Sequence, residues 1–342
     1  MSGTMAFETG FDSNRRMTDS ADPHPSAEPA PSPPTRTQHV PVLLREVLQT
    51  LDLTPGLTVV DGTLGGGGHS RAILQRIGPT GRLIGLDRDA RMVHLSAARF
   101  SGSNVHLVHA SYAHLPRVLK DLNIDRVDRI LLDLGWCSDQ LADAERGFSF
   151  QTDGPLDLRY DVTGGKPAWK LLDVLGEDEI AKIIETYGED HLARQHARRI
   201  VAARNQRPLR TTFDLVSAIT GTPAPWRSTG SDSRHPATQV FQALRIAVNE
   251  ELEQLQEALN GVCDSCLTPH GILAVISFHS LEDRMVKLAL RDQTRWQAVL
   301  SKPLAASPAE QRLNPRSRTA LLRAARKKPP ALQPSTAHPA GR

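Results

Sequence analysis

Residues 61–70 have the sequence Asp61-Gly62-Thr63-Leu64-Gly65-Gly66-Gly67-Gly68-His69-Ser70, and this stretch predicts the fold. It follows the run Leu57–Val60, which is typical of a buried parallel strand. Ser70 can cap a helix that ends at Gly78-Pro79. A strand, a glycine-rich loop and a helix in this order form the first unit of a doubly wound α/β fold. The glycines let the backbone approach a ligand at the helix N-terminus.

Two aspartates indicate which ligand this loop binds. Asp87 ends the next expected strand, Arg82–Leu86, about twenty residues past the loop, where an acid suits the hydroxyl groups of an adenosine ribose. That position fits a nicotinamide dinucleotide equally well. Asp61 favours a methyl donor, because a pyrophosphate placed beside it would meet a carboxylate of like charge. S-adenosylmethionine has no phosphate and carries an ammonium and a sulfonium. We therefore expect it as the cofactor, with a dinucleotide and an empty loop as the alternatives.

The composition indicates a soluble globular chain, and its 342 residues favour two domains or one domain with a large insertion. No apolar run is long enough to span a bilayer, and the N-terminus lacks an apolar signal-peptide core. The three cysteines do not make a disulfide framework, which is consistent with a reducing cytoplasm. The pair Cys263 and Cys266 has no second pair to complete a metal site. We expect a cytoplasmic protein with no membrane partner and no metal.

Changes in composition divide the chain into segments. Residues 1–37 are rich in proline and serine and poor in aromatic residues, so we expect a disordered tail. An α/β pattern covers residues 38–140, gives way to helical patterns over 141–236 and resumes over 237–328. Residues 329–342 are expected to form a second disordered tail, basic and rich in proline. The predicted fold is a Rossmann-like α/β domain with an inserted all-helical domain.

The second α/β part contains one long expected helix and one candidate base. Apolar residues at intervals of three and four predict a single helix over residues 237–260. A strand over 271–278 precedes His279. This histidine can act as a general base, or it can be a hydrogen-bonded structural residue at a strand–helix junction.

Two residues at the ends of expected strands are further candidates. Asp133 ends the strand that begins at Arg129, where a carboxylate can face both cofactor and substrate, although a plain helix cap is the alternative. Tyr112 follows the strand Val105–Val108. It can flank an adenine ring or pack in the core, and the sequence does not decide between these roles.

The formal net charge is only +3, but basic residues are unevenly distributed. They accumulate after Glu310, and one other stretch without an acid contains Arg194, Arg198, Arg199, Arg204, Arg207 and Arg210. Such runs are usually solvated faces. Two of them in a chain with a cofactor loop favour a polyanionic substrate.

A series of longer motifs occurs in one order along the chain. It includes Val40–Leu44, Asp61–Ser70, Gly85–Asp89, Leu131–Gly135, Glu145–Phe150, Gly154–Asp157, Tyr187–Glu189, His235–Thr238, Phe241–Ile246, Ile276–Arg284 and Asn314–Arg316. Over roughly His39 to Arg326 the chain resembles the bacterial small-subunit ribosomal RNA methyltransferase H family. The resemblance implies a class I methyltransferase domain with an inserted helical domain. It also implies that a methyl group is transferred from S-adenosylmethionine to N4 of a cytosine in the decoding region of 16S ribosomal RNA.

The resemblance also implies roles for individual residues. It places the methyl-donor contacts on Gly67, Gly68, His69, Asp87, Tyr112, Asp133 and Gln140. An acceptor for the amine hydrogen is expected at Asp133 together with the groups around Gly135–Ser138, so Asp133 and Ser138 are the candidate catalytic residues. The clustering of five arginines without an acid gives a separate expectation, that they bind phosphates of the RNA: Arg194, Arg198, Arg199, Arg204 and Arg207.

The chain departs from the family pattern near the expected cytosine pocket. Trp136 and Cys137 stand where the family usually has a small apolar residue and a serine, and Asp139 replaces a usual proline. Tyr160 stands where the family usually has methionine. Trp136 or Phe148 can stack on a base that has swung out of the RNA. The expected partner is 16S RNA, within a small ribosomal subunit or its precursor, and the oligomeric state stays open.

Overall fold

The computed structural model describes residues 41–225 and 235–330. The tail expected over residues 1–37 lies outside these ranges, as does most of the tail expected over 329–342. Within the described ranges, no helix is long and apolar enough to cross a membrane.

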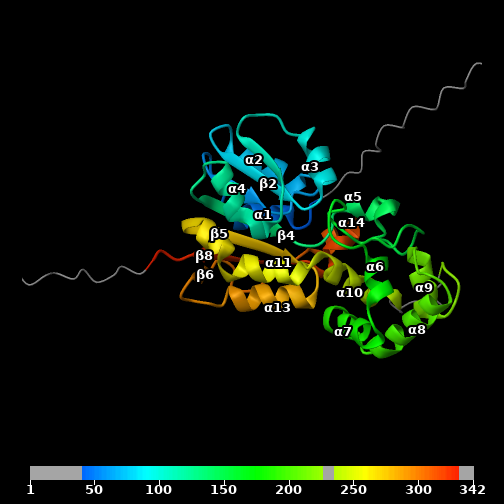
Figure 1. Ribbon diagram of the computed structural model, residues 1–342. Coiled ribbons are helices and arrows are strands. Elements are labelled where there is room, and N and C mark those ends of the chain that lie inside the picture. The colour runs from blue at the N-terminus through cyan, green and yellow to red at the C-terminus, as the bar shows by residue number, and fades with distance from the viewer. Residues whose placement is uncertain (1–40, 226–234, 331–342) are drawn as a thin grey trace, which may run out of the picture. The chain divides into compact units, whose positions relative to one another are not determined.

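The described residues contain one mixed sheet of eight strands (Figure 1). Its strands are β1 (Thr58–Asp61), β2 (Arg82–Asp87), β3 (Val105–His109), β4 (Val127–Asp133), β5 (Leu267–Ser277), β6 (Trp296–Ala298), β7 (Leu304–Ala305) and β8 (Leu321–Lys327). The strand order is β3-β2-β1-β4-β5-β8-β6, and β7 pairs with β8. All pairs of neighbouring strands among β1 to β5 are parallel. Strand β8 runs antiparallel to β5, β6 and β7. The expected Rossmann-like α/β class is confirmed.

The strand order reverses at β1 and β4, which are neighbours in the sheet. In open α/β sheets, ligands bind in the crevice outside the carboxyl ends of the strands at this point. The loop of residues 61–70 follows β1, and Asp133 ends β4. The N–H of Gly62 donates to the carbonyl of Leu131 at 2.8 Å, so the two candidate stretches lie side by side.

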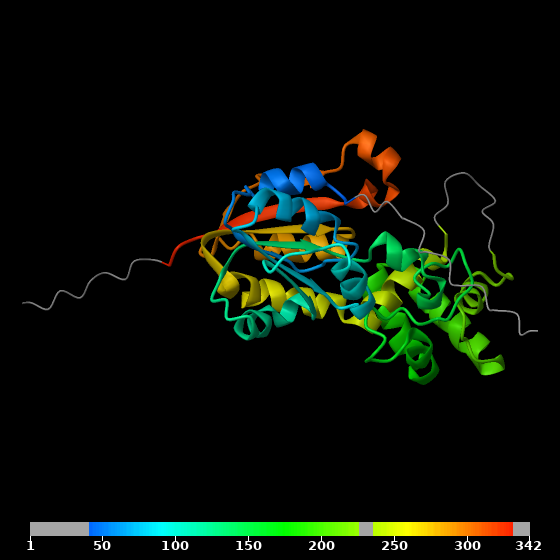
Figure 2. The same ribbon diagram turned by 90° about the horizontal axis from the view of Figure 1, so that it is seen from above.

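Alternate residues of the central strands enter two different hydrophobic clusters. Val59 and Leu131 pack with residues of α1 (Leu44–Thr50) and α2 (Gly68–Ile77). Val60 and Leu132 pack with residues of α4 (Leu115–Asp121) and α11 (Glu251–Glu257). Successive side chains of a strand point to opposite faces, so these apolar strands are buried on both sides. Figure 2 shows the helices on the two faces of the sheet.

A helical segment lies between β4 and β5 in sequence and has a hydrophobic cluster of its own. Its helices are α5 (Ser138–Ala142), α6 (Ala168–Val174), α7 (Glu177–Gly188), α8 (Ala193–Gln206) and α9 (Thr212–Thr220). Val240 and Leu244 of α10 (Ala237–Asn249) belong to the same cluster. The domain boundaries at residues 141 and 236 stay a prediction. The remaining helices are α3 (Ala90–Ala97), α12 (Cys263–Cys266), α13 (Ser280–Ala289) and α14 (Pro308–Leu313).

The prediction of a single helix over residues 237–260 is wrong. Helix α10 ends at Asn249 and α11 begins at Glu251, because Glu250 between them has a positive φ of 51°. The side-chain oxygen of Asn249 accepts the backbone N–H of Tyr160 at 2.7 Å. The backbone carbonyl of Asn249 accepts from Nη1 of Arg88 at 2.5 Å. The apolar spacing continues through the break, so the sequence does not reveal it. The break connects the helical segment to the end of β2.

Strand β8 was not expected, because its residues fall in the basic C-terminal run. Leu322 and Ala324 are buried on one side, and Arg323 forms an ion pair with Asp283 at 2.7 Å. Part of the basic run therefore forms an inner strand of the sheet and not a free surface.

Candidate active site

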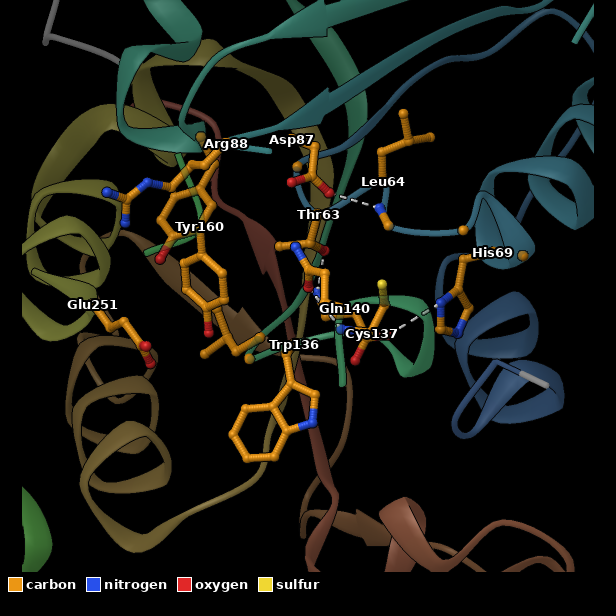
Figure 3. A pocket seen from close by; sticks show the side chains of 18 of the residues that line it. Thr63, Leu64, His69, Asp87, Arg88, Trp136, Cys137, Gln140, Tyr160 and Glu251 are labelled. Carbon is orange, nitrogen blue, oxygen red and sulfur yellow. Dashed lines mark hydrogen bonds and ion pairs between the residues drawn. The ribbon is translucent and has the colours of Figure 1, made fainter. Parts of the chain in front are cut away.

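A cavity at the carboxyl edge of the sheet encloses about 850 Å³, part of it open to solvent (Figure 3). The loop after β1 lines the cavity with Gly62–Gly66, Gly68 and His69, and the ends of β2 and β4 contribute Asp87 and Asp133. Arg88 and Trp136, just after these strand ends, also line the cavity. More distant parts of the chain contribute Tyr160, Glu251, Glu282 and Arg316.

The glycines of the loop allow it to close against its own protein neighbours. Gly65 and Gly67 have positive φ angles of 48° and 74°, which residues with a side chain rarely adopt. A Cβ atom on Gly68 would lie 2.4 Å from Cγ of Pro41. The N–H of Gly65 donates to Oδ2 of Asp87 at 2.8 Å, which ties the loop to the end of β2.

The helix cap expected at Ser70 is wrong. Helix α2 begins at Gly68, and Ser70 lies inside it. Its hydroxyl donates to Oδ2 of Asp61 at 2.7 Å, and the N–H of Thr63 donates to Oδ1 of Asp61 at 3.2 Å. Asp61 is buried and does not line the cavity; burial raises its pKa. Its carboxylate therefore supports the loop from inside the protein.

Asp87 lines the cavity at the end of β2, as expected. Its Oδ1 accepts the N–H of Asp89 and its Oδ2 accepts that of Gly65, both at 2.8 Å. Burial raises the pKa of Asp87 to about 6 in spite of these hydrogen bonds, which favour the charged form. A carboxylate oxygen has two lone pairs, so Asp87 can still accept a hydroxyl of a ligand.

Asp133 lines the cavity at the end of β4. Its N–H donates to Oγ1 of Thr63 at 2.6 Å, which connects β4 to the glycine loop. Its Oδ2 lies 3.5 Å from Nδ1 of His69. Its Oδ1 is buried and has no hydrogen-bond partner among the described residues. Burial raises the pKa of Asp133 to about 7, although the positive charge of Arg316 opposes the rise.

His69 is buried between Val42 and Asp133, the last residue of β4. Its Nε2 lies 3.0 Å from the carbonyl oxygen of Val42, which can only accept, so Nε2 carries the hydrogen and Nδ1 faces Asp133. Burial lowers the pKa of His69, so the ring is neutral at physiological pH.

Gln140 and Tyr112 line the cavity, but both also hold the protein together. Gln140 accepts the N–H of Cys137 at 3.0 Å and donates to Oδ2 of Asp89 at 3.0 Å. Asp89 also pairs with Arg146 at 3.0 Å. Tyr112 belongs to the hydrophobic cluster of the α4 face, so the cavity wall and the core share this ring.

Gly67 and Ser138 are not among the residues that line the cavity. A Cβ atom on Gly67 would lie 2.8 Å from the ring of Phe100, so this glycine serves packing. Cys137 lines the wall next to Ser138. Burial raises the pKa of the Cys137 thiol to about 12, so it is not a reactive nucleophile near neutral pH. The catalytic role of Ser138 stays a prediction.

The contacts of His279 fit the structural role that was the alternative to catalysis. It precedes α13 and its Nδ1 accepts from the N–H of Glu282, while Nε2 lies 3.2 Å from Oε1 of that residue. Glu251, His279 and Glu282 bring possible metal ligands within 4.8 Å of one another. Both carboxylate oxygens of Glu251 already accept from Arg245, at 2.8 and 2.9 Å. The guanidinium therefore already supplies the positive charge that a metal ion would bring to this cluster.

The residues to which sequence reasoning gave no role lie on the side of the cavity that contains Arg88 and Glu251. Glu251 reaches the cavity because the chain turns at Glu250, and Tyr160 reaches it through its hydrogen bond to Asn249. Arg316, from the C-terminal part, donates to the carbonyl of Trp136. No short-range pattern links these positions. In the sequence, Arg88 and Arg316 belong to the motifs Gly85–Asp89 and Asn314–Arg316, and Tyr160 is a departure from the family pattern, but none of them was assigned a role in the site.

Each of the five arginines expected to bind RNA has a partner within the helical segment. Three pair with acids of α7 or α9: Arg194 with Asp178, Arg198 with Glu177, and Arg207 with Asp214. Two donate to carbonyls: Arg199 to Ile219 and Arg204 to Leu172. The charge pattern of one stretch misses these partners, because they lie on neighbouring elements. Arg194 and Arg198 are still 84% and 77% exposed, and exposed ion pairs contribute little to stability.

Comparisons with known proteins agree with the motifs. The chain is 46% identical over 301 residues to "Ribosomal RNA small subunit methyltransferase H" of Sorangium cellulosum, covering 87% of this chain and 94% of that protein. It is 46% identical over 315 residues to the protein of the same name from Magnetococcus marinus, covering 85% and 98%. The sequence model of the MraW methylase family matches residues 36–328. The family expected from the motifs is confirmed: the chain belongs to the MraW methylase family.

Proposed function

We propose that this protein transfers a methyl group from S-adenosylmethionine to N4 of a cytosine in the decoding region of 16S ribosomal RNA. Family membership and the names of the relatives support ribosomal RNA methylation. The observation that best supports this chemistry concerns Asp133, which lines the cavity. Its Oδ1 is a buried acceptor without a hydrogen-bond partner among residues 41–225 and 235–330.

The charges around the cavity fit a cationic methyl donor. Asp87 and Asp133 line it and Asp61 lies beneath its loop, and burial raises the pKa of all three. Buried carboxylates are disfavoured in the ionised form, and a nearby cation offsets that cost. S-adenosylmethionine would bring an ammonium and a sulfonium to these groups, whereas a dinucleotide would bring a pyrophosphate of the same sign.

This arrangement predicts that donor affinity increases with pH. Asp87 and Asp133, with pKa values of about 6 and about 7, are protonated in acid and become attractive to a cation only when they ionise. Between about pH 5.5 and pH 8 we expect the affinity for S-adenosylmethionine to rise roughly tenfold or more, since one pKa unit corresponds to a factor of ten. Calorimetry across this range measures it.

S-adenosylhomocysteine, which lacks the sulfonium charge, is the matched control and is expected to show a shallower rise. Calorimetry in buffers of different ionisation enthalpy should also show proton release when the methyl donor binds near pH 6.5. A flat affinity profile for both ligands would mean that these carboxylates do not face the donor.

The residues around Asp133 can assist methyl transfer to an exocyclic amine. Bound S-adenosylmethionine supplies the electrophilic methyl group. The bond from N4 to the methyl carbon forms as the carbon–sulfur bond breaks, and one amine proton must leave. The amine lone pair is delocalised into the ring, so acceptance of an N–H hydrogen bond by Asp133 helps to localise it. A carboxyl group with a pKa of about 7 is suited to take that proton near neutral pH.

The helical segment is proposed to bind the RNA backbone. Arg194, Arg198 and Arg207 are 84%, 77% and 67% exposed, and the contact that holds each side chain within the described residues is an ion pair that a phosphate can replace. Replacing these three by alanine should weaken RNA binding and reduce the slope of log K against log salt concentration by roughly one unit per lost contact. Filter binding at several salt concentrations gives this slope.

Arg199→Ala is the control for this prediction. Arg199 donates to the carbonyl of Ile219 at 2.6 Å, so its loss should lower stability more than it changes the slope. Donor affinity should be spared in all variants. An unchanged slope in the triple variant would assign the arginines to pairing within the helical segment.

The proposed substrate is 16S RNA within a small ribosomal subunit or its precursor, in the cytoplasm. The test is transfer of labelled methyl groups from S-adenosylmethionine to small subunits from a strain that lacks this gene, followed by mapping of the modified nucleotide. Label at N4 of a cytosine in the decoding region supports the proposal. Binding of NAD in preference to S-adenosylmethionine would favour an oxidoreductase, and donor binding without transfer to any subunit or RNA would favour a non-catalytic RNA-binding factor.

A further inference from the structure

Trp136 brings a second buried and unpartnered polar group to the cavity. Trp136 lines the cavity, and its Nε1 is buried without a hydrogen-bond partner in the part of the chain that the structure describes. The indole nitrogen can only donate, and a buried donor without an acceptor is unfavourable. An acceptor atom on a bound ligand would remove this cost.

The position of the indole is held by charged neighbours. The guanidinium carbon of Arg245 lies 4.2 Å from the centroid of the Trp136 ring. Arg245 is buried and donates to both oxygens of Glu251, so it cannot easily move away. Arg316 donates to the carbonyl of Trp136 and holds the backbone. Figure 3 shows the indole nitrogen on the side of the ring away from Glu251.

Trp136 and Asp133 together offer one donor and one acceptor. Both Nε1 of Trp136 and Oδ1 of Asp133 are buried and unpartnered among the described residues, and both residues line the same cavity. The edge of cytosine carries the complementary pair: the N4 amine donates, and the ring atom N3 and the oxygen O2 accept. Uracil has an acceptor in place of the amine and a donor at N3, so it would leave Asp133 unsatisfied. It would leave Trp136 unsatisfied as well where N3 is the acceptor, whereas O2 is an acceptor in both bases.

We propose that Trp136 takes part in recognition of the target cytosine by donating its indole N–H to N3 or O2 of the base while Asp133 accepts from N4. This inference rests on the proposed function, because it takes cytosine as the substrate base. It assigns to Trp136 a hydrogen bond in addition to any stacking on the base.

Trp136→Phe tests the hydrogen bond, because it keeps an aromatic ring for Arg245 and removes the N–H donor together with the smaller ring that carries it. Trp296→Phe is the matched control: Nε1 of Trp296 is also buried and unpartnered among the described residues, but Trp296 is in the core and does not line the cavity. The readout is inhibition of methyl transfer to small ribosomal subunits by free cytidine, by 3-deazacytidine, which lacks N3, and by 2-thiocytidine, in which sulfur replaces O2.

The wild-type enzyme should be inhibited about tenfold more strongly by cytidine than by the analogue that lacks the acceptor in use, the scale of one good base contact. In Trp136→Phe this ratio should fall to about one, and in Trp296→Phe it should stay at the wild-type value. Loss of the ratio with 3-deazacytidine identifies N3 as the acceptor, and loss with 2-thiocytidine identifies O2. Wild-type ratios for both analogues in Trp136→Phe would overturn the role of Trp136 while leaving the proposed function intact. Absence of methyl transfer by the wild-type enzyme would overturn both.

Discussion

Replacing Asp133 by Asn is expected to lower the turnover number about 100-fold or more while the protein stays folded. The Asn side chain keeps the size of the carboxylate but cannot take a proton and accepts hydrogen bonds less strongly. Oδ1 of Asp133 is buried, unpartnered among the described residues and held near the glycine loop by the Thr63 hydrogen bond. Removal of one preorganised partner of the transition state typically costs a factor of about 10² to 10³. Single-turnover transfer to small ribosomal subunits measures the effect.

The stability of the same variant separates a catalytic role from a structural one. Because burial raises the pKa of Asp133 to about 7 in the folded protein, the folded state binds a proton more tightly than the unfolded chain does. Stability is therefore lost as the pH rises from the unfolded value toward about 7, and above it the ionised buried carboxylate is a net cost. At pH 8 we expect Asp133→Asn to melt at or above the wild-type temperature. Wild-type single-turnover rates in the variant, or collapse of its fold, would contradict the role in transfer.

Replacing Asp87 by Ala is expected to weaken the binding of S-adenosylmethionine by about 2–3 kcal/mol, the scale of charge-assisted hydrogen bonds. The carboxylate lines the cavity and can accept the ribose hydroxyls. It also accepts the N–H groups of Gly65 and Asp89, so the variant loses some order of the glycine loop as well. Calorimetry with the purified protein gives the affinity.

A comparison of donors separates the two contributions of Asp87. An analogue of S-adenosylmethionine without ribose hydroxyls should bind the wild type more weakly than the natural donor. In Asp87→Ala the two donors should bind about equally, because the acceptor is gone. An equal difference in both proteins would mean that Asp87 acts only through the loop, and unchanged affinity for the natural donor in a folded variant would remove Asp87 from the site.

The donor side of the cavity was predictable because it is built from local patterns. The glycine loop and the acids at the ends of β2 and β4 follow strands that are visible as apolar runs, and the carboxyl ends of parallel strands meet at one edge of a sheet. Gly68, His69, Asp87 and Asp133 all line the cavity. The Ser70 cap failed because the hydroxyl is taken by Asp61, a contact between a helix and the preceding strand.

The other side of the cavity depends on contacts between distant segments. Trp136, Tyr160 and Arg316 lie on separate segments, and each is placed by a hydrogen bond or ring contact to a residue far away in sequence. The break at Glu250 illustrates the limit. The apolar spacing of residues 237–260 is that of one helix, and only the bonds made by Asn249 end it.

The sequence by itself determined the Rossmann-like class, the family and the position of the donor loop, because these depend on strand periodicity, glycine spacing and motifs read along one chain. The tertiary structure alone decided the partners of the charged and polar groups. It pairs Arg194 and Arg198 with acids of α7, and it pairs Arg323 of strand β8 with Asp283. It leaves Oδ1 of Asp133 and Nε1 of Trp136 without partners among the described residues. Charge pairing and burial depend on distances in space, and residues far apart in sequence reach those distances only when the helices and strands pack.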